Sequence, residues 1–415
     1  MNLLNLLNLL NLLNLLNLLN LLNLPVVYSV PMRRIFLLSA LVSGAVTVGF
    51  AQTAALKVEP LWPKPFPVAK HWILGSVTGV TVDAQDHIWV VHRGVDSLQN
   101  NEKGPTLEPW ASQCCFSAPQ ILEFDPAGTL VASWDVGANK GYDWPHDPSG
   151  IAVDKAGNVY VGGGLAPSAL PAGRGRGPAP EGAAAAAPAR GARGGDAPAA
   201  GRGDAAAAQG RGRGAAPAPP PPPATAVLKF DKTGKFVSAI SGVERPLAVA
   251  VDDAANELYV GDDGHGRIAV FDTATGAQKR EWKANGDAFK TIACVKVGKD
   301  GMVYVCDRGN NRIQVFSKDG KFQKEAKVAA DTKGDGSVWD LAWSPDRKTL
   351  YVADGHNKKV WTLDAASLQT TGSIGQGGRY PGEFYGVSAV AVDSKGNLYT
   401  GETYEGKRVQ KFVKR

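Results

Sequence analysis

The stretch GKDGMVYVCDRGNNRIQVFSKDGKF, residues 298–322, carries the pattern that decides the fold. Val303–Cys306 and Ile313–Phe316 are short runs of β-branched and aromatic residues, which favour strands. The Gly/Asn-rich segment between the runs and the SKDG sequence after them are typical turn sequences. The stretch therefore predicts two neighbouring antiparallel strands joined by a tight turn.

This strand–turn–strand pattern recurs along the chain. Three further copies are ELYVGDDGHGRIAVFDTATG (residues 257–276), TLYVADGHNKKVWTLDAAS (349–367) and NLYTGETYEGKRVQKF (397–412). Each copy follows another short apolar run, and the four runs end 46, 47 and 48 residues apart, at Asp252, Gly298, Pro345 and Asp393. A period of this length with about four strands in each unit is typical of β-propeller blades.

Two more apolar runs lie upstream and end at Asp83 and Asp154, which gives six units. The segment between the second and third strands is 23 residues longer in the first unit than in the later units, and 58 residues longer in the second. We therefore predict an all-β, six-bladed propeller of four-stranded antiparallel blades with two insertions. Seven blades are the alternative, but no seventh set of strands is found in the sequence.

The last unit lacks a fourth strand, because the sequence ends at Arg415 after the third. A missing outer strand leaves an unpaired edge. The segment LKVEPLW, residues 56–62, precedes the first unit and has no partner of its own. We predict that this N-terminal strand pairs into blade six and closes the ring.

The N-terminal residues predict export. Residues 1–31 are mostly a low-complexity Asn-Leu-Leu leader, expected to lie upstream of the true start. Residues 32–51 combine two arginines, a short apolar run and a small-x-small site, as in a secretory signal peptide. We expect cleavage after Ala51, a periplasmic or extracellular location, and a single propeller over 52–415. The apolar run is short for a membrane span, so no stable span is expected after cleavage.

The second insertion, residues 165–224, consists almost entirely of Ala, Gly, Pro and Arg and is expected to be disordered. Its seven arginines and three acids contribute +4 of the formal net charge of +6. The basic balance therefore belongs mostly to this segment and not to a folded face. Because no aromatic residues are interleaved with the arginines, a solvated spacer is expected, and a nucleic-acid partner is not.

The four cysteines leave their redox state open. Cys294 and Cys306 fall on neighbouring predicted strands, where they either bridge in an oxidising compartment or stay buried as free thiols. The adjacent Cys114 and Cys115 are candidates for a vicinal disulfide. Neither pair has the spacing of zinc ligands.

Loops that leave the second strands and loops that enter the inner strands meet at one mouth of a propeller's tunnel, and both insertions fall at that end. The candidate ligand-binding residues there are His92, Arg93, Asp307, Arg308, Tyr385 and Glu402. A guanidinium at a tunnel mouth needs an anionic partner, either a neighbouring acid or a ligand carboxylate. The alternative role for each blade-end acid is to cap a turn.

Four histidines are expected near the mouth, where they are possible metal ligands. His92, His146, His265 and His356 occupy non-equivalent positions in their blades, so a three-histidine zinc cage is not expected. His146 is the best single candidate, with zinc or calcium as the ion.

The repeats, with forms such as CDRGNNRIQVFSKDGKF, resemble NHL repeats over residues 56–415. More narrowly, GVTVDAQDHIWVVHRG, CDRGNNRIQVF and GNLYTGETYEGKRVQKF are similar to the peptidyl-α-hydroxyglycine α-amidating lyase family and its bacterial relatives. This resemblance implies a six-bladed propeller with a zinc held by three histidines, two substrate-binding arginines and a tyrosine base. The arginines carry over to Arg93 in VHRG and to Arg308 in CDRGNNR.

The sequence departs from that family at its catalytic positions. The positions of the three zinc histidines read Ser149, Ala293 and Ser388, and the tyrosine position reads Gly264 or His265. Loss of the three histidines removes the Lewis acid that such a lyase needs.

Two functions follow as hypotheses. The first is an exported, monomeric NHL-type propeller that binds a small anionic ligand, a peptide or a protein partner at the tunnel mouth without catalysis. The alternative is an amidating lyase-like C–N lyase with an altered metal site built on His146, Asp307 or Glu402.

Overall fold

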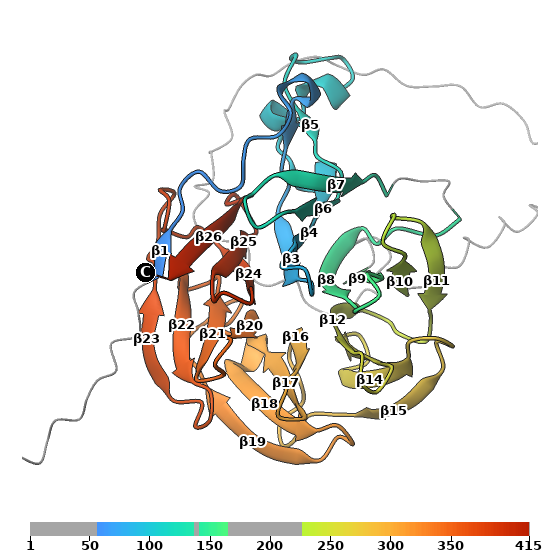
Figure 1. The fold of residues 1–415 in the computed structure, drawn as a ribbon, viewed down its shortest axis with the longest axis vertical. Helices are drawn as coiled ribbons and strands as arrows, with labels where there is room; N and C mark the ends of the chain where they lie inside the picture. Colours follow the sequence, from blue (N-terminus) through green and yellow to red (C-terminus); the bar gives the residue numbers. More distant parts are fainter. Residues whose placement is uncertain (1–55, 137–140, 165–225, 415) are drawn as a thin grey trace, which may run out of the picture. The chain divides into compact units, whose positions relative to one another are not determined.

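The computed structural model describes residues 56–136, 141–164 and 226–414, all within one compact unit, Ala55–Arg415. Six four-stranded antiparallel sheets are arranged as the blades of a propeller (Figure 1). This confirms the predicted fold class and the count of six. The predicted leader, signal peptide and Ala/Gly/Pro/Arg insertion lie outside the described residues.

Each blade runs from an inner to an outer strand. Blade one contains β3 (Val77–Val82), β4 (Ile88–His92), β6 (Ile121–Phe124) and β7 (Leu130–Trp134). Blade two contains β8 (Asp147–Val153), β9 (Val159–Gly164), β10 (Val227–Phe230) and β11 (Phe236–Ile240). Blade three contains β12 (Pro246–Asp252), β13 (Glu257–Asp262), β14 (Arg267–Asp272) and β15 (Gln278–Trp282). Blade four contains β16 (Ile292–Val297), β17 (Met302–Asp307), β18 (Arg312–Ser317) and β19 (Phe322–Lys327). Blade five contains β20 (Asp340–Trp343), β21 (Thr349–Asp354), β22 (Lys359–Asp364) and β23 (Thr370–Ile374).

Blade six contains β24 (Val387–Val392), β25 (Leu398–Glu402), β26 (Val409–Lys414) and β1 (Leu56–Val58). Strand β1 pairs antiparallel with β26, with Leu56 opposite Lys414 and Val58 opposite Phe412. The N-terminal strand therefore closes the ring as predicted, and it covers the edge that β26 would otherwise expose.

The core lies between neighbouring blades. The second strands β4 and β13 are buried along their whole length, because each is covered on both faces by adjacent blades. Cys306 and Val315 of blade four, for example, share one hydrophobic cluster with Leu350 and Val352 of blade five. The outer strand β15, by contrast, is mostly exposed. Burial is thus greatest in the second strands, lower in inner strands such as β3, and least at the rim.

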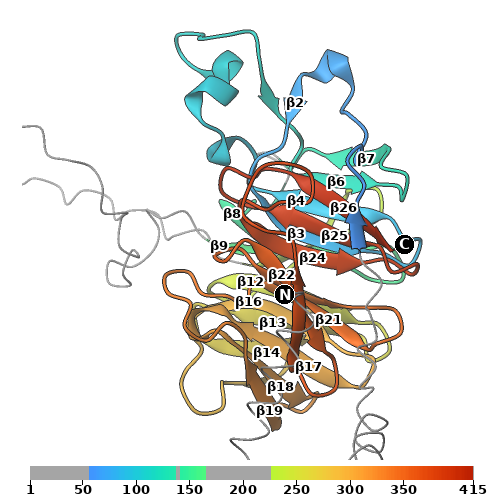
Figure 2. The same cartoon turned by 90° about the vertical axis from the view of Figure 1, so that its left-hand side faces the viewer.

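Both insertions lie between second and third strands, as predicted. The first, between β4 and β6, contains the 3-10 helices η3 (Gly94–Ser97), η4 (Asn100–Glu102) and η5 (Gly104–Thr106) and the short strand β5 (Phe116–Ser117). Strand β5 pairs in parallel with β2 (Trp72–Ile73), which follows η2 (Val68–Lys70). Together these segments project from blade one (Figure 2). No helix in the described ranges is long and apolar enough to cross a membrane.

The four cysteines form two disulfides, Cys294–Cys306 and Cys114–Cys115. Cys294 and Cys306 lie directly opposite each other in the register of β16 and β17, with Cα atoms 4.8 Å apart. For this pair, the structure selects the bridge over the free thiols that the sequence left as an alternative.

Candidate functional site

Three arginines meet at one mouth of the tunnel. Arg93 follows β4, Arg245 precedes β12, and Arg308 follows β17 at the start of η7 (Arg308–Asn310). They line a cavity of about 80 Å³ together with Thr78, Asp147, Ser149, Leu247, Thr291, Ala293, Trp339, Ser388 and Thr403. Since roughly 10–15 Å³ of such space holds one water molecule, the cavity accepts a chemical group of a few heavy atoms.

Two of the three guanidiniums have acidic partners. Arg93 Nε forms a short ion pair with Asp147 Oδ1, and both side chains are about one-third exposed. Arg245 Nη1 lies 2.9 Å from Oδ2 of Asp263. In each pair the aspartate neutralises the charge of its arginine and holds the guanidinium at the rim of the cavity.

Arg308 has no such partner. Its guanidinium carbon lies 4.1 Å from the ring centroid of Trp339, and its Nε is buried without a hydrogen-bond partner. Among the described residues, no carboxylate comes within 4.0 Å of its side-chain nitrogens. Burial lowers the pKa of Arg308, and the charge of Asp335 raises it in part. A buried donor without a partner is costly, so the Nε of the partly buried Arg308 is the feature of the mouth that points to an anionic ligand.

The predicted acidic ligands have other partners. Asp307 is fully buried and accepts hydrogen bonds from the Lys290 amide at 2.9 Å and from Arg312 Nε at 2.7 Å. Glu402 is also fully buried, and it accepts hydrogen bonds from the Tyr385 amide at 2.6 Å and from Arg408 Nε. Neither acid lines the cavity. Both join the second strand of a blade to the loop that enters its inner strand, which is a structural role.

His92 and Tyr385 also lie outside the cavity. The His92 ring is buried; its Nδ1 accepts from the amides of Gly75 and Gly94 at 3.2 and 3.0 Å, and its Nε2 donates to Pro119 O at 2.9 Å. Burial lowers the pKa of His92 to about 4, so the ring is neutral at pH 7. The guanidinium carbon of Arg379 lies over the Tyr385 ring, 4.5 Å from the centroid of that ring. His92 and Tyr385 therefore contact the surrounding protein and do not line the mouth cavity.

His146 belongs to a different cavity. It is half-exposed and lies 3.7 Å from Asp96, measured from Nε2 to Oδ2. It lines a space of about 1,020 Å³ beside the first insertion, whose wall includes Trp72, Phe116, Tyr142 and Trp144. The structure does not bring His146 together with Asp307 or Glu402 in the mouth cavity, so the altered metal site of the lyase hypothesis is not assembled from these residues.

The zinc of the amidating lyases does not fit the residues at the mouth. The three positions where its histidines would fall, Ser149, Ala293 and Ser388, all line the cavity. Ser149 Oγ donates to the Leu247 carbonyl at 3.0 Å, and Ser388 Oγ donates to the Val77 carbonyl at 2.7 Å. Two engaged hydroxyls and a methyl group are not a zinc ligand set, which requires imidazole, thiolate or carboxylate.

Arg245 is the mouth residue that the sequence reasoning missed. It stands seven residues before Asp252, just as Asp147, the partner of Arg93, stands seven residues before Asp154. Alignment of DPSGIAVD (residues 147–154) with RPLAVAVD (245–252) places Arg245 at the same position as Asp147, and this alignment is the sequence signal that identifies Arg245. The structure therefore brings together Arg93 and Arg308 of the predicted site and adds Arg245.

Comparisons with known proteins agree with the fold. The sequence model of the NHL repeat family matches residues 289–316, which include Arg308. WD repeat-containing protein 1 of Mus musculus is 28% identical over 92 residues, 22% of this chain and 15% of that protein. NHL repeat-containing protein 3 of Mus musculus is 28% identical over 134 residues, 30% of this chain and 36% of that protein. The matches thus span much less than two-thirds of these relatives.

Two solved structures are similar at low identity. A structural genomics protein of unknown function from Bacteroides thetaiotaomicron aligns with a TM-score of 0.49 and 13% identity, over 82% of this chain and 70% of that chain. Hydrazine synthase of Kuenenia stuttgartiensis aligns with a TM-score of 0.33 and 21% identity, over 42% of this chain and 49% of that chain. The protein is a six-bladed β-propeller, and its fourth blade carries the matched NHL repeat.

Proposed function

We propose that this protein is an exported binding propeller that holds the carboxylate group of a small ligand at its tunnel mouth. The observation that carries the proposal is Arg308, a partly buried arginine in the wall of a cavity whose Nε is buried and has no hydrogen-bond partner. Carboxylates are the natural partners of a guanidinium, because two oxygens match its fork of N–H donors.

The charged side chains at the mouth favour a ligand that carries a single negative charge. Arg93 and Arg245 each have a carboxylate in direct contact, Asp147 and Asp263, whereas the charge of Arg308 has none in contact and is influenced by Asp335 only at longer range. A monoanionic carboxylate neutralises this charge, whereas a dianionic phosphate would exceed it. Trp339 and Leu247 in the wall provide apolar contact for the carbon atoms beside the carboxylate.

The small volume limits how the ligand binds. A cavity of about 80 Å³ takes the carboxylate and its first carbons, so the remainder of a larger ligand lies outside the mouth. A carboxyl-terminal peptide end and a free carboxylic acid share this chemistry. Two disulfides support export, because such bonds persist in oxidising compartments.

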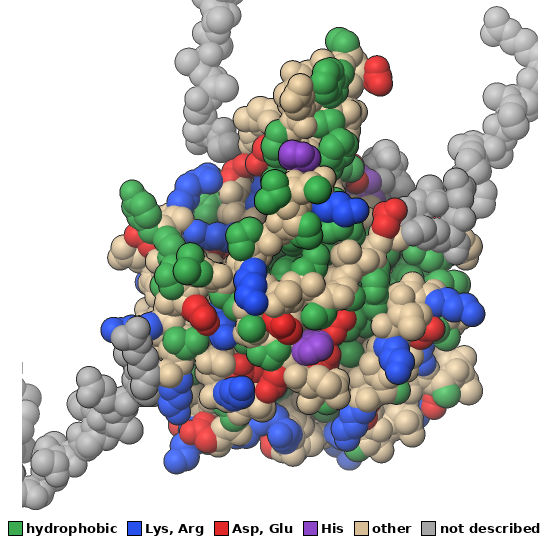
Figure 3. Space-filling view, turned by 45° about the horizontal axis from the view of Figure 1, so that its top comes forward, with side chains coloured by type: hydrophobic (Ala, Val, Ile, Leu, Met, Phe, Trp, Pro, Cys, Tyr) green, Lys and Arg blue, Asp and Glu red, His purple; other side chains and the backbone are tan. Residues whose placement is uncertain are grey.

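The distribution of charge on one face of the molecule supports a function other than nucleic-acid binding. On the face drawn in Figure 3, basic and acidic side chains are interspersed and form no continuous basic stripe. Nucleic-acid-binding surfaces concentrate Lys and Arg on one face or along one groove.

Ligand-dependent thermal unfolding tests the proposal. Acetate, propionate, phosphate and chloride are compared at constant ionic strength with the chain purified in a chelator. A ligand that binds only the folded state adds about 2.7 kcal/mol at one hundred times its Kd, so the monocarboxylates raise the Tm and Arg308→Gln abolishes that rise. Arg379→Gln, which removes a rim arginine outside the cavity, is the matched control and retains it. Equal stabilisation of Arg308→Gln and the parent protein, or stabilisation by phosphate alone, contradicts the proposal.

A further inference from the structure

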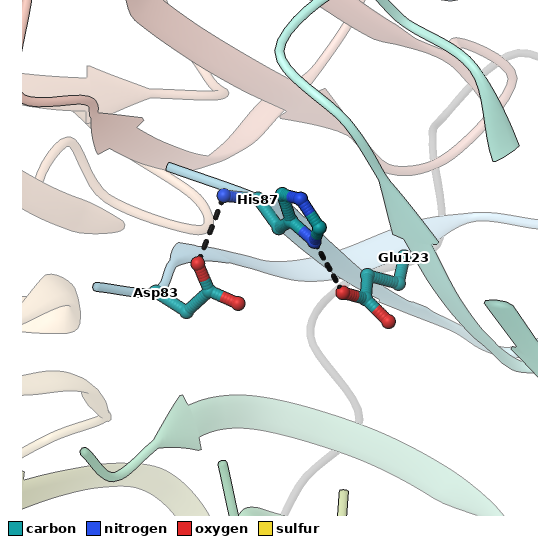
Figure 4. A group of neighbouring side chains, drawn as sticks. All are labelled: Asp83, His87 and Glu123. Carbon is teal, nitrogen blue, oxygen red and sulfur yellow. Dashed lines mark hydrogen bonds and ion pairs between the residues drawn. The ribbon is translucent and has the colours of Figure 1, made fainter. Parts of the chain in front are cut away.

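A second group of ligand-type side chains lies at the opposite end of blade one from the mouth. Asp83 follows β3, His87 precedes β4, and Glu123 lies in β6. One ligand atom from each residue lies within 4.8 Å of the other two. Figure 4 shows the His87 ring between the two carboxylates. Nothing in the proposed function uses these residues.

Blades two and six have the same aspartate at this position and allow a direct comparison of its neighbours. Asp83, Asp154 and Asp393 are equivalent, because the Oδ1 of each accepts two amide hydrogen bonds in its turn. The Oδ2 of each accepts a hydrogen bond from an aromatic residue two positions into the next strand: Trp89 at 2.9 Å, Tyr160 at 3.3 Å and Tyr399 at 3.0 Å. The aspartate is thus a common turn cap, and its two neighbours in blade one are the unusual residues.

The first unusual neighbour is His87. Blade two has Asn158 there and blade six has Asn397, and each amide donates to the Oδ2 of its aspartate, at 2.7 and 2.6 Å. In blade one the imidazole does not make this bond; its Nδ1 lies instead 2.5 Å from Glu123 Oε1. The substitution replaces a hydrogen-bond donor to the carboxylate with a potential metal ligand.

The second unusual neighbour is Glu123, the cross-strand partner of Trp89. The residues paired with the corresponding tyrosines are Lys229 in blade two and Lys411 in blade six. Their ammonium groups lie 5.3 and 5.9 Å from the tyrosine ring centroids. Blade one therefore replaces a cation at this place with a carboxylate. In the part of the chain that the structure describes, no Lys or Arg forms an ion pair with Asp83 or Glu123.

From these two replacements we propose that Asp83, His87 and Glu123 form a binding site for a divalent transition-metal ion, with Zn²⁺ as the best match. Imidazole and carboxylate are ligands of zinc, and three protein ligands leave a fourth tetrahedral position for water. The ion supplies the positive charge that the lysine supplies in blades two and six. Trp89 orients the Asp83 carboxylate through its hydrogen bond, as outer partners of metal ligands do.

The side chains have room to adopt the required geometry. Zinc bonds of about 2.0–2.2 Å place two tetrahedral ligands roughly 3.4 Å apart, so His87 Nδ1 and Glu123 Oε1 must separate by about 1 Å. The two side chains are 32% and 15% exposed, and neither is tightly enclosed. Asp83 also lines a cavity of about 720 Å³ at this end of the tunnel, which gives an ion access from solvent.

Metal binding by the whole protein tests the site. The full chain, purified without a polyhistidine tag and stripped with a chelator, is titrated with Zn²⁺ by calorimetry, and bound metal is counted by mass spectrometry. We expect about one Zn²⁺ per chain and, with Co²⁺ as the probe, the visible absorption of a tetrahedral site. The double variant His87→Asn/Glu123→Lys, which restores the residues of blades two and six, loses both signals. His146→Asn, which removes an exposed histidine elsewhere, retains them.

The single variants keep the test decisive if the double variant is unstable. His87→Asn and Glu123→Gln are each expected to weaken Zn²⁺ binding by at least tenfold while Tm without metal stays close to that of the parent chain. Absence of stoichiometric zinc in the parent chain overturns the site. Binding that is unchanged in His87→Asn overturns it equally, because the metal would then be held elsewhere. Neither result affects the carboxylate site, which lies at the other end of the tunnel and is tested in chelator.

Discussion

Arg308 begins the four-residue connection between β17 and β18 in blade four, Arg312 follows it as the first residue of β18, and the surroundings of the two arginines are opposite. Arg312 is buried with its Nε 2.7 Å from Asp307 Oδ2 and its Nη1 3.1 Å from Glu325 Oε2. The Arg308 guanidinium lies 4.1 Å from the ring centroid of Trp339 and, among the described residues, has no carboxylate within 4.0 Å. Arg312 thus has acidic partners within the protein, and Arg308 has a buried Nε without a hydrogen-bond partner.

This contrast predicts different effects on stability. Breaking a buried ion pair costs about 3–5 kcal/mol, so Arg312→Met should lower the free energy of unfolding by that amount. Arg308→Met should change it by less than about 1 kcal/mol, because removal of an unpaired, partly buried charge offsets the lost contact with Trp339. Urea unfolding of the two variants measures both values. A loss of several kcal/mol in Arg308→Met would show that Arg308 has a structural role.

Glu402 provides a test of the structural acids. Its fully buried carboxylate holds the Tyr385 amide, Arg408 and Gln410 together. Glu402→Gln leaves Arg408, which is one-quarter exposed, without its counter-charge, so we expect a loss of about 2–4 kcal/mol in unfolding free energy. Carboxylate affinity, measured in the same preparation, should stay within about threefold of the parent protein. A selective loss of affinity at unchanged stability would return Glu402 to the site.

Ring closure depends on the segment after β1. Trp62 is buried with its ring centroid 5.9 Å from that of Phe124 in blade one and 5.0 Å from that of Tyr399 in blade six. Trp62→Ala removes a large side chain from this seam, and we expect a loss of about 3–5 kcal/mol. Hydrogen exchange should show the greatest loss of protection in β26, the strand paired with β1. Uniform loss over all six blades would indicate that opening of the ring is global.

The buried His92 makes stability depend on pH. Its pKa falls from 6.5 to about 4 on burial, so the unfolded chain binds a proton at this residue between these values and the folded protein does not. Stability from His92 is therefore full above pH 6.5 and declines as the pH falls toward 4, by up to about 3 kcal/mol. His92→Gln should flatten this part of the profile of unfolding free energy against pH. An unchanged slope in the variant would assign the acid sensitivity to other groups.

The repeat period made the fold predictable, because each blade repeats the same turn residues at the same offsets. The anchors at Asp83, Asp154, Asp252 and Asp393 lie at the end of an inner strand or directly after it, and removal of the insertions shortens the two long spacings to 48 and 40 residues. Closure by the segment 56–62, of which Leu56–Val58 form β1, followed from the fourth strand that the last repeat lacks. Both conclusions needed only local pattern and the requirement that sheet edges be paired.

The roles of the polar residues were harder to predict, since they depend on which atoms are already engaged. Asp262, Asp307 and Glu402 are each followed five or six residues later by an arginine, Arg267, Arg312 or Arg408, that pairs with them. That spacing is visible in the sequence and would have identified these acids as structural. His92 is different, because Pro119, its acceptor, stands 27 residues away at the far end of an insertion.

The most direct test of the carboxylate site is the indole NMR signal of Trp339 during titration with acetate at constant ionic strength. Trp339 Nε1–H donates to the Gly336 carbonyl at 2.8 Å and its ring lies under the Arg308 guanidinium, so the signal is protected and close to the expected ligand. Assignment comes from its loss in Trp339→Phe. A carboxylate bound to Arg308 should shift this signal progressively to saturation in the parent protein and leave it unmoved in Arg308→Gln. A signal that does not respond to acetate in the parent protein, or that shifts equally in Arg308→Gln, would contradict the account.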